Sequence, residues 1–111
     1  MANRDRAAIC ADILSVTLKE MKQFGGALKT HIMYKANLSH RQLERYIAEL
    51  SESGMLLEVQ DPLENGHRLY ITTDKGIDFL KDYNKLFNYL KNPEIQTLPE
   101  IQVPLVKTSS L

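Results

Sequence analysis

The sequence has a single cysteine and no long apolar run. Cys10 has no partner within the chain, so an intramolecular disulfide is excluded, which fits a reducing compartment. No stretch approaches the roughly 20 apolar residues that a membrane-spanning helix requires, and the N-terminus lacks the apolar core of a secretory signal. The 111 residues therefore predict one cytoplasmic domain of a soluble protein.

Excess charge of one sign is also lacking, since 14 basic residues balance 14 acidic ones. This balance argues against a protein that coats DNA through bulk positive charge. The charges are nevertheless polarised along the chain. Residues 29–48 hold four Lys or Arg and one acid, whereas residues 49–64 hold five acids and neither Lys nor Arg. The neutral total therefore does not exclude a specific DNA binder, because the local charge decides such a contact.

Patterns of catalytic or metal-binding residues are missing as well. The three histidines do not stand at metal-ligand spacing with one another or with Cys10. Gly25 and Gly26 interrupt a helical pattern and do not form a phosphate-binding loop. Cys10 is expected as a small core residue, and the acidic residues as scattered over helix surfaces. The sequence thus predicts no enzymatic activity, no cofactor and no metal site.

Hydrophobic periodicity and cap residues predict four helices. Thr30 is expected to cap the second and Thr73 the last. The third follows a turn at residues 37–39 and starts with an S-x-x-Q capping box, Ser39 and Gln42, while Gly54 is a suitable residue just beyond its end. The expected ranges are 4–22, 31–36, 40–53 and 74–91.

Two short apolar segments, 55–60 and 68–72, predict the strands of a hairpin. The turn between them, 61–67, contains Pro62 and the Asn65-Gly66 pair, which are strong turn signals. Ala27 and Leu28 are expected to form a bridge or short edge strand. Residues 92–111 carry three of the four prolines and are expected to be an extended or disordered tail.

The resulting order, three helices, a hairpin and a last helix, is the α+β winged helix-turn-helix arrangement. We therefore predict one winged helix domain over residues 4–91, followed by the tail. The third helix would be its recognition helix. On a helical wheel its apolar residues form one side, and the positions farthest from them are Arg41, Arg45, Ala48 and Glu52.

Recognition helices place their N-terminal residues against base edges. Arginine can bond guanine bidentately, and glutamine can do so with adenine. Candidate base contacts are therefore His40, Arg41, Gln42 and Arg45. Candidate phosphate contacts border the same surface, and these are Lys29, His31, Tyr34 and Lys35. In the wing, His67 and Arg68 are candidates for contact with the DNA backbone or the minor groove.

The alternative for each of these residues is a solvated polar surface. Glu44 leaves three alternatives open: it pairs with a neighbouring Arg or His, accepts a hydrogen bond from cytosine, or repels phosphates. Pairing is the favoured one.

The last helix carries an apolar stripe that a small domain cannot cover along its whole length. The simplest cover is a second copy of the chain in a twofold dimer. The alternative is that the helix folds back on the first helix. The candidate dimer contacts are Phe79, Tyr83, Leu86, Phe87 and Leu90.

Two segments resemble the small archaeal winged helix-turn-helix regulators, which are dimeric and have a C-terminal coiled-coil helix. They are KTHIMYKANLSHRQLERYIAELSESGMLL at 29–57 and YITTDKGIDFL at 70–80. The family's Ile-Met-Tyr-x-Ala-x-Leu-Ser pattern is matched over Ile32–Ser39, and its Thr-x-Lys-Gly pattern over Thr73–Gly76. The resemblance implies a dimer through the last helix and DNA contact through the third. The last helix is shorter than in the coiled-coil members, and the tail is not part of the pattern.

Two functions follow as hypotheses. The first is a sequence-specific transcriptional regulator, cytoplasmic and associated with the nucleoid, that binds double-stranded DNA as a homodimer. The second is a winged-helix module for protein–protein interaction in a transcription or viral assembly, which the neutral charge and the acidic stretch at 49–64 favour.

Overall fold

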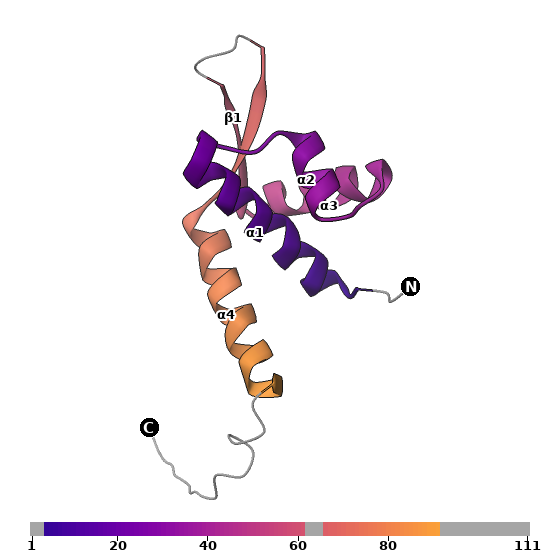
Figure 1. The fold of residues 1–111 in the computed structure, drawn as a ribbon, viewed down its shortest axis with the longest axis vertical. Helices are drawn as coiled ribbons and strands as arrows, with labels where there is room; N and C mark the ends of the chain where they lie inside the picture. Colours follow the sequence, from indigo (N-terminus) through magenta and orange to yellow (C-terminus); the bar gives the residue numbers. More distant parts are fainter. Residues whose placement is uncertain (1–3, 62–65, 92–111) are drawn as a thin grey trace, which may run out of the picture. The chain divides into compact units, whose positions relative to one another are not determined.

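The computed structural model of the chain describes residues 4–61 and 66–91. These residues form α1 (Arg6–Phe24), α2 (Lys29–Lys35), α3 (His40–Glu52), β1 (Leu56–Gln60), β2 (Arg68–Thr72) and α4 (Asp74–Lys91) (Figure 1). The predicted element order and the winged helix-turn-helix fold class are confirmed. The expected tail and most of the expected turn, residues 62–65, lie outside the described residues. None of the helices described is long and apolar enough to cross a membrane.

The described residues fall into two units that divide within α4, after Lys81. In the first unit α2 contacts both α1 and α3, while β1 contacts α3 and β2 contacts α1 (Figure 1). Its core gathers apolar side chains from these elements, with Phe79 and Leu80 of α4 packed against it. Cys10 also packs against this core, as predicted, and burial raises the pKa of its thiol.

Local capping sets both ends of α1. The Asp5 carboxylate accepts a hydrogen bond from the Ala8 amide over 2.8 Å, so the helix begins at Arg6, two residues later than predicted. At the other end Gly25 adopts the left-handed conformation, with φ of 85°, and its amide donates to the Met21 carbonyl. Consequently α1 continues through Phe24, and Gly26, two residues later, lies against Leu69 of the hairpin.

The prediction for the start of α2 was wrong. Thr30 is not its cap, because Leu28 occupies that position and the helix begins at Lys29. The cause is a tertiary contact: Ala27 and Tyr70 exchange two backbone hydrogen bonds of 2.9 and 2.8 Å. This bridge, which was predicted for Ala27, holds the chain extended up to Leu28 and leaves Thr30 inside the first turn.

The predicted capping box at the start of α3 is confirmed. The Ser39 amide donates to Oε1 of Gln42 over 3.1 Å, and the Gln42 amide donates to Oγ of Ser39 over 3.2 Å. Beyond the helix, Gly54 has φ of 84°, as expected for the residue that follows the C-cap. The start of α3, where base contacts are expected, is therefore fixed by its own sequence.

The hairpin is held to the helices at its base. Leu56 pairs with Thr72 and Gln60 with Arg68 in an antiparallel register. The Thr72 hydroxyl donates to the Leu14 carbonyl over 2.9 Å, within the buried interior. Next along the chain, Thr73 caps α4 as predicted, since its hydroxyl accepts from the Gly76 amide over 3.2 Å. The hairpin is thereby anchored to α1, and α4 begins directly after it.

Candidate nucleic-acid interface

The two faces of α3 lie as the helical wheel predicts. Its buried side chains are Leu43, Tyr46, Ile47 and Leu50. Arg41, Arg45 and Ala48 are exposed on the other side, as is Glu52 near the C-terminal end. The outer face of α3 thus presents two arginines one turn apart, followed by a small residue that leaves room for close approach.

The next feature is the environment of the two arginines on the outer face of α3. Within residues 4–61 and 66–91, neither Arg41 nor Arg45 takes part in an ion pair. The guanidinium carbon of Arg45 lies 5.4 Å from the centroid of the Tyr46 ring, a cation–π contact that orients the side chain. Both guanidiniums therefore retain donors for a planar acceptor pair such as a guanine edge or a phosphate.

Glu44, between these arginines in the sequence, holds two of the candidate contact residues. Its Oε2 accepts a 2.9 Å hydrogen bond from Nζ of Lys29 and lies 3.5 Å from Nε2 of His40. The bond from Lys29 lowers the pKa of Glu44 and raises the pKa of Lys29, so this pair is ionised at neutral pH. The sequence favoured a pairing of Glu44 with a neighbouring Arg or His. Of these His40 lies within ion-pair distance, whereas the closer partner, Lys29, was not anticipated.

Gln42 is also engaged within the protein. Its Oε1 accepts from the Ser39 amide in the capping box. A bidentate bond to adenine uses both ends of the amide, so that contact would require Gln42 to leave the capping box. In this structure Gln42 shapes the start of α3.

Lys35 and His31 point to α1 instead of α3. Nζ of Lys35 donates to Oε2 of Glu20 over 2.6 Å, and Nδ1 of His31 lies 3.3 Å from Oε1 of the same carboxylate. Glu20 is buried, with 3% of its surface exposed. The hydrogen bond from Lys35 lowers the pKa of Glu20 and outweighs the opposing effect of burial.

The expectation that the acidic residues lie scattered over helix surfaces is therefore wrong for Glu20. A signal was available in the sequence, because Glu20 follows Ile13 and Thr17 at the helical spacing of the buried face of α1. An acid on an apolar stripe calls for a cationic partner on the element packed against it. The spacing alone does not say that this partner comes from α2.

The remaining candidates are divided between paired and exposed residues. Arg68 donates to Glu58 on the neighbouring strand, with Nη1 and Oε2 3.0 Å apart. His67 is exposed at the turn end of the hairpin, directly before β2, and takes part in a further interaction. Tyr34 is 82% exposed on α2. Arg41, Arg45 and Tyr34 are thus exposed. Lys29, Lys35 and Arg68, by contrast, each form an ion pair with a carboxylate.

The C-terminal part of α4 exposes apolar side chains. Leu86 is 63%, Phe87 45% and Leu90 79% exposed in the single chain. The rings of Tyr83 and Phe87 stack, with centroids 6.4 Å apart and planes 10° from parallel. Phe79, by contrast, packs against the core of the first unit. Of the candidate dimer residues, Phe79 thus packs against the core, while Leu86, Phe87 and Leu90 form an exposed stripe further along α4.

Comparisons with known proteins agree with this architecture. A family model described as winged helix-turn-helix matches residues 3–91. A search of curated protein sequences gives no match. Among solved structures, Sso10a-2, a DNA-binding protein from Sulfolobus solfataricus, aligns with a TM-score of 0.62 at 19% identity, over 89% of this chain and 100% of its own.

Two bacterial structures are also similar. The S. aureus MepR–DNA complex aligns with a TM-score of 0.60 at 14% identity, over 82% of this chain and 63% of that one. CouR from Rhodococcus jostii RHA1, bound to p-coumaroyl-CoA, aligns with a TM-score of 0.63 at 18% identity, over 82% and 62%. The chain thus spans less than two thirds of these two relatives. At such identities the likeness shows the shared fold.

Proposed function

Because this chain belongs to the winged helix-turn-helix family, we propose that it is a sequence-specific transcriptional regulator that binds double-stranded DNA with α3 in the major groove. The proposal rests above all on the outer face of α3, where Arg41 and Arg45 are exposed and outside any ion pair with a described residue. Sso10a-2 is a DNA-binding protein and MepR has a DNA complex, which supports this class of partner. Bound to DNA, the protein would work in the cytoplasm on the nucleoid, and as a regulator it would have no catalytic role.

In the proposed mechanism the N-terminal cap of α3 positions the arginines that would contact the bases. The capping box fixes the first turn, so Arg41 starts from a defined backbone position. Arg45, one turn later, is steadied by its contact with Tyr46, which reduces the side-chain entropy lost on binding. Each guanidinium can then donate two bonds to O6 and N7 of a guanine. Tyr34 on α2 would meet the backbone beside this contact.

We further propose that the protein acts as a homodimer. The exposed apolar stripe of α4 formed by Leu86, Phe87 and Leu90 supports this, because a soluble chain rarely leaves such a patch uncovered. A twofold dimer would present two copies of α3 and would favour operators with two half-sites.

The binding proposal is tested by Arg41→Ala/Arg45→Ala. The ligand is a duplex selected from a random pool by the wild-type protein, and affinity is measured by fluorescence anisotropy over a range of salt concentrations. We expect at least a tenfold loss of affinity for the selected duplex and a smaller loss for unselected duplexes, because arginines that bond base edges carry sequence specificity. The thermal unfolding midpoint should not change, because both side chains are exposed.

The matched control is Lys19→Ala/Lys22→Ala, which removes the same charge from exposed positions of α1. Its affinity should remain close to that of the wild type. Equal losses in both variants would mean that net charge alone is responsible and that α3 does not read DNA.

One observation favours the alternative, a protein–protein module. Three of the candidate phosphate contacts are already paired with carboxylates, namely Lys29 with Glu44, Lys35 with Glu20 and Arg68 with Glu58. If the random pool yields no enriched duplex and the wild-type protein does not bind DNA at low salt, this alternative replaces the regulator.

A further inference from the structure

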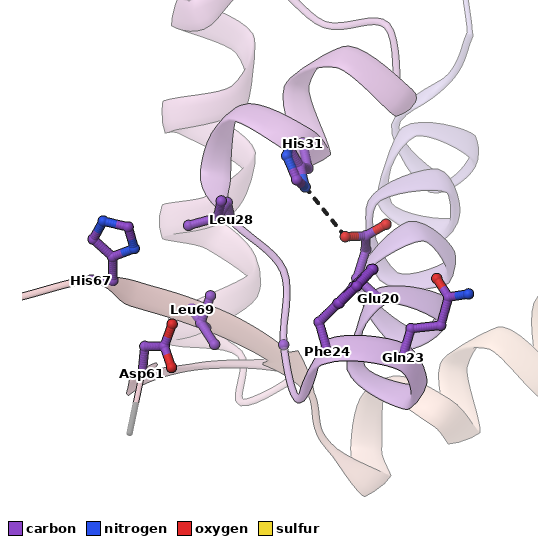
Figure 2. A pocket seen from close by; sticks show the side chains of 9 residues that line it. Glu20, Gln23, Phe24, Leu28, His31, Asp61, His67 and Leu69 are labelled. Carbon is purple, nitrogen blue, oxygen red and sulfur yellow. Dashed lines mark hydrogen bonds and ion pairs between the residues drawn. The ribbon is translucent and has the colours of Figure 1, made fainter. Parts of the chain in front are cut away.

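The buried carboxylate of Glu20, on α1, is shared between two basic side chains of α2. Its Oε2 accepts a 2.6 Å hydrogen bond from Nζ of Lys35, and its Oε1 lies 3.3 Å from Nδ1 of His31. Figure 2 shows the imidazole of His31 directed at this carboxylate. One acid thus has a lysine on one oxygen and a histidine on the other.

The same arrangement occurs a second time, at the other end of α2. Oε2 of Glu44 accepts from Nζ of Lys29 over 2.9 Å and lies 3.5 Å from Nε2 of His40. Lys29 is the first residue of α2 and Lys35 the last. Both lysines are candidate phosphate contacts. Each is therefore held by a carboxylate that also has a histidine beside it.

Protonation of the histidine changes what the carboxylate needs from the lysine. Imidazole side chains change their charge between about pH 5 and 8. While His31 is neutral, moving Lys35 away would leave the charge of Glu20 buried and unpaired, which is costly. Protonated His31 supplies a second cation to the same carboxylate, so this cost falls. The side chain of Lys35 is 58% exposed and can turn toward a ligand in solvent.

Other titratable groups also face the first of these histidines. His31 lines a groove of about 580 Å³ between the end of α1, the start of α2 and the hairpin. Asp61 and His67 line it from the hairpin, as Figure 2 shows, and each takes part in a further interaction. Glu20 is the acid within ion-pair distance of His31. Its pKa is lowered by the bond from Lys35, so it remains ionised at pH 5.5.

The second carboxylate has charged neighbours on the hairpin. Glu58 and Tyr70 both act on Lys29, but Glu58 is paired with Arg68. Burial raises the pKa of Tyr70, so its hydroxyl stays neutral up to pH 8. The bond from Lys29 lowers the pKa of Glu44, which keeps this acid ionised at pH 5.5 as well. Among the groups around the two carboxylates, the histidines are thus the ones that titrate between pH 5.5 and 8.

We propose that these two histidines are a pH switch for DNA binding. Protonated His31 and His40 replace the lysines as cationic partners of the carboxylates. Lys29 and Lys35 then become available to DNA phosphates, and DNA is bound more tightly at pH 5.5 than at pH 8. Glu20 makes the larger contribution, because an unpaired charge costs more when it is buried. The DNA step rests on the proposed regulator function, whereas the exchange at the carboxylates does not.

The exchange is tested without DNA, by urea unfolding of the full chain at pH 5.5 and pH 8. Lys35→Met removes the ammonium group and keeps most of the stem. The resulting loss in the urea midpoint should be at least twice as large at pH 8 as at pH 5.5, because protonated His31 replaces the lysine at the lower pH. In a His31→Gln background the loss should be equal at both pH values. The matched control is Lys22→Met, at an exposed position of α1, whose effect should not depend on pH.

The DNA step is tested by anisotropy with an unselected duplex at the same two pH values. We expect binding at least fivefold tighter at pH 5.5, with a slope of log K against log salt steeper by about 0.9 for each lysine released. His31→Gln/His40→Gln should bind nearly equally at both. Lys29→Met/Lys35→Met should also lose the pH dependence, although its histidines remain.

Each part of the switch can be contradicted separately. A midpoint loss in Lys35→Met that is the same at both pH values would overturn the exchange. A pH dependence of DNA binding that survives in Lys29→Met/Lys35→Met would show that the histidines act on DNA without the lysines, and one that survives in His31→Gln/His40→Gln would place the titrating group elsewhere. Exchange in the unfolding experiment without DNA binding at either pH would reject the regulator function and, with it, the DNA step.

Discussion

Nζ of Lys29, the first residue of α2, donates a hydrogen bond to Oε2 of Glu44 in α3 over 2.9 Å. The bond joins the two helices of the helix-turn-helix on the side that carries the candidate DNA contacts. It also neutralises the lysine that the sequence places among the phosphate contacts. Phosphate and Glu44 would therefore compete for the same ammonium group, and this competition can be measured.

Glu44→Gln should raise the affinity for non-specific duplex DNA. The substitution releases Lys29 to a phosphate and removes a negative charge from the surface that faces the DNA. We expect the slope of log K against log salt to become steeper by about 0.9, the value for one added phosphate contact. Anisotropy titrations at four salt concentrations measure it.

The control for this variant is Glu52→Gln, which changes the net charge equally from another exposed position of α3. It should leave the salt slope unchanged, since the structure gives Glu52 no lysine to release among the described residues. The same steepening in both variants would argue that Lys29 is not involved.

Glu20→Gln should destabilise the domain by about 1.5 kcal/mol at pH 7, the scale of a hydrogen bond to a charged group. The carboxylate is buried and accepts from Lys35 over 2.6 Å, and a neutral amide satisfies this ammonium less well. Urea unfolding followed by circular dichroism gives the difference between the two proteins.

The same pair predicts a pH dependence. The pKa of Glu20 lies below its ordinary value of 4.5, so its contribution is complete above pH 4.5 and is lost as the pH falls toward the lowered pKa. The stability difference between wild type and Glu20→Gln should therefore shrink when unfolding is repeated at pH 3. A difference that is the same at both pH values would exclude the ionised carboxylate as its source.

Gly26→Ala should destabilise the domain by about 1–3 kcal/mol, the usual cost of overpacking. The added Cβ would meet Cβ of Leu69 at 2.7 Å and the Tyr70 carbonyl oxygen at 3.2 Å. Neither atom is the end of a flexible side chain, so the hairpin must move away from the chain after α1. Thermal unfolding measures the cost, and an unchanged midpoint would contradict the close packing.

Leu86→Glu/Leu90→Glu should convert the proposed dimer into a monomer. Both side chains belong to the exposed stripe of α4, where a carboxylate could not be buried against a second copy without a large penalty. Light scattering should report 12.7 kDa for the variant and twice this mass for the wild type.

The matched control is Asn84→Glu/Asn88→Glu, which adds the same charge at exposed positions of α4 off the stripe. It should remain a dimer. A monomeric wild type, or a dimer that survives the changes at Leu86 and Leu90, would remove this stripe as the interface.

The sequence alone determined where most elements lie and which side of α3 is outward. The capping box of Ser39 and Gln42 formed as predicted, because both partners stand within one turn of helix. The apolar face of α3 was equally predictable, since any helix places Leu43, Ile47 and Leu50 on one side. These are local relations, which the spacing of residues fixes before the chain packs.

Only the tertiary structure decided which charges meet. Lys29 pairs with Glu44 and Lys35 with Glu20, each across 15 positions of sequence and between different helices. The start of α2 likewise depended on the bridge from Ala27 to Tyr70 on the second strand. Such contacts require helices and hairpin to be already packed, so no spacing along the chain reveals them.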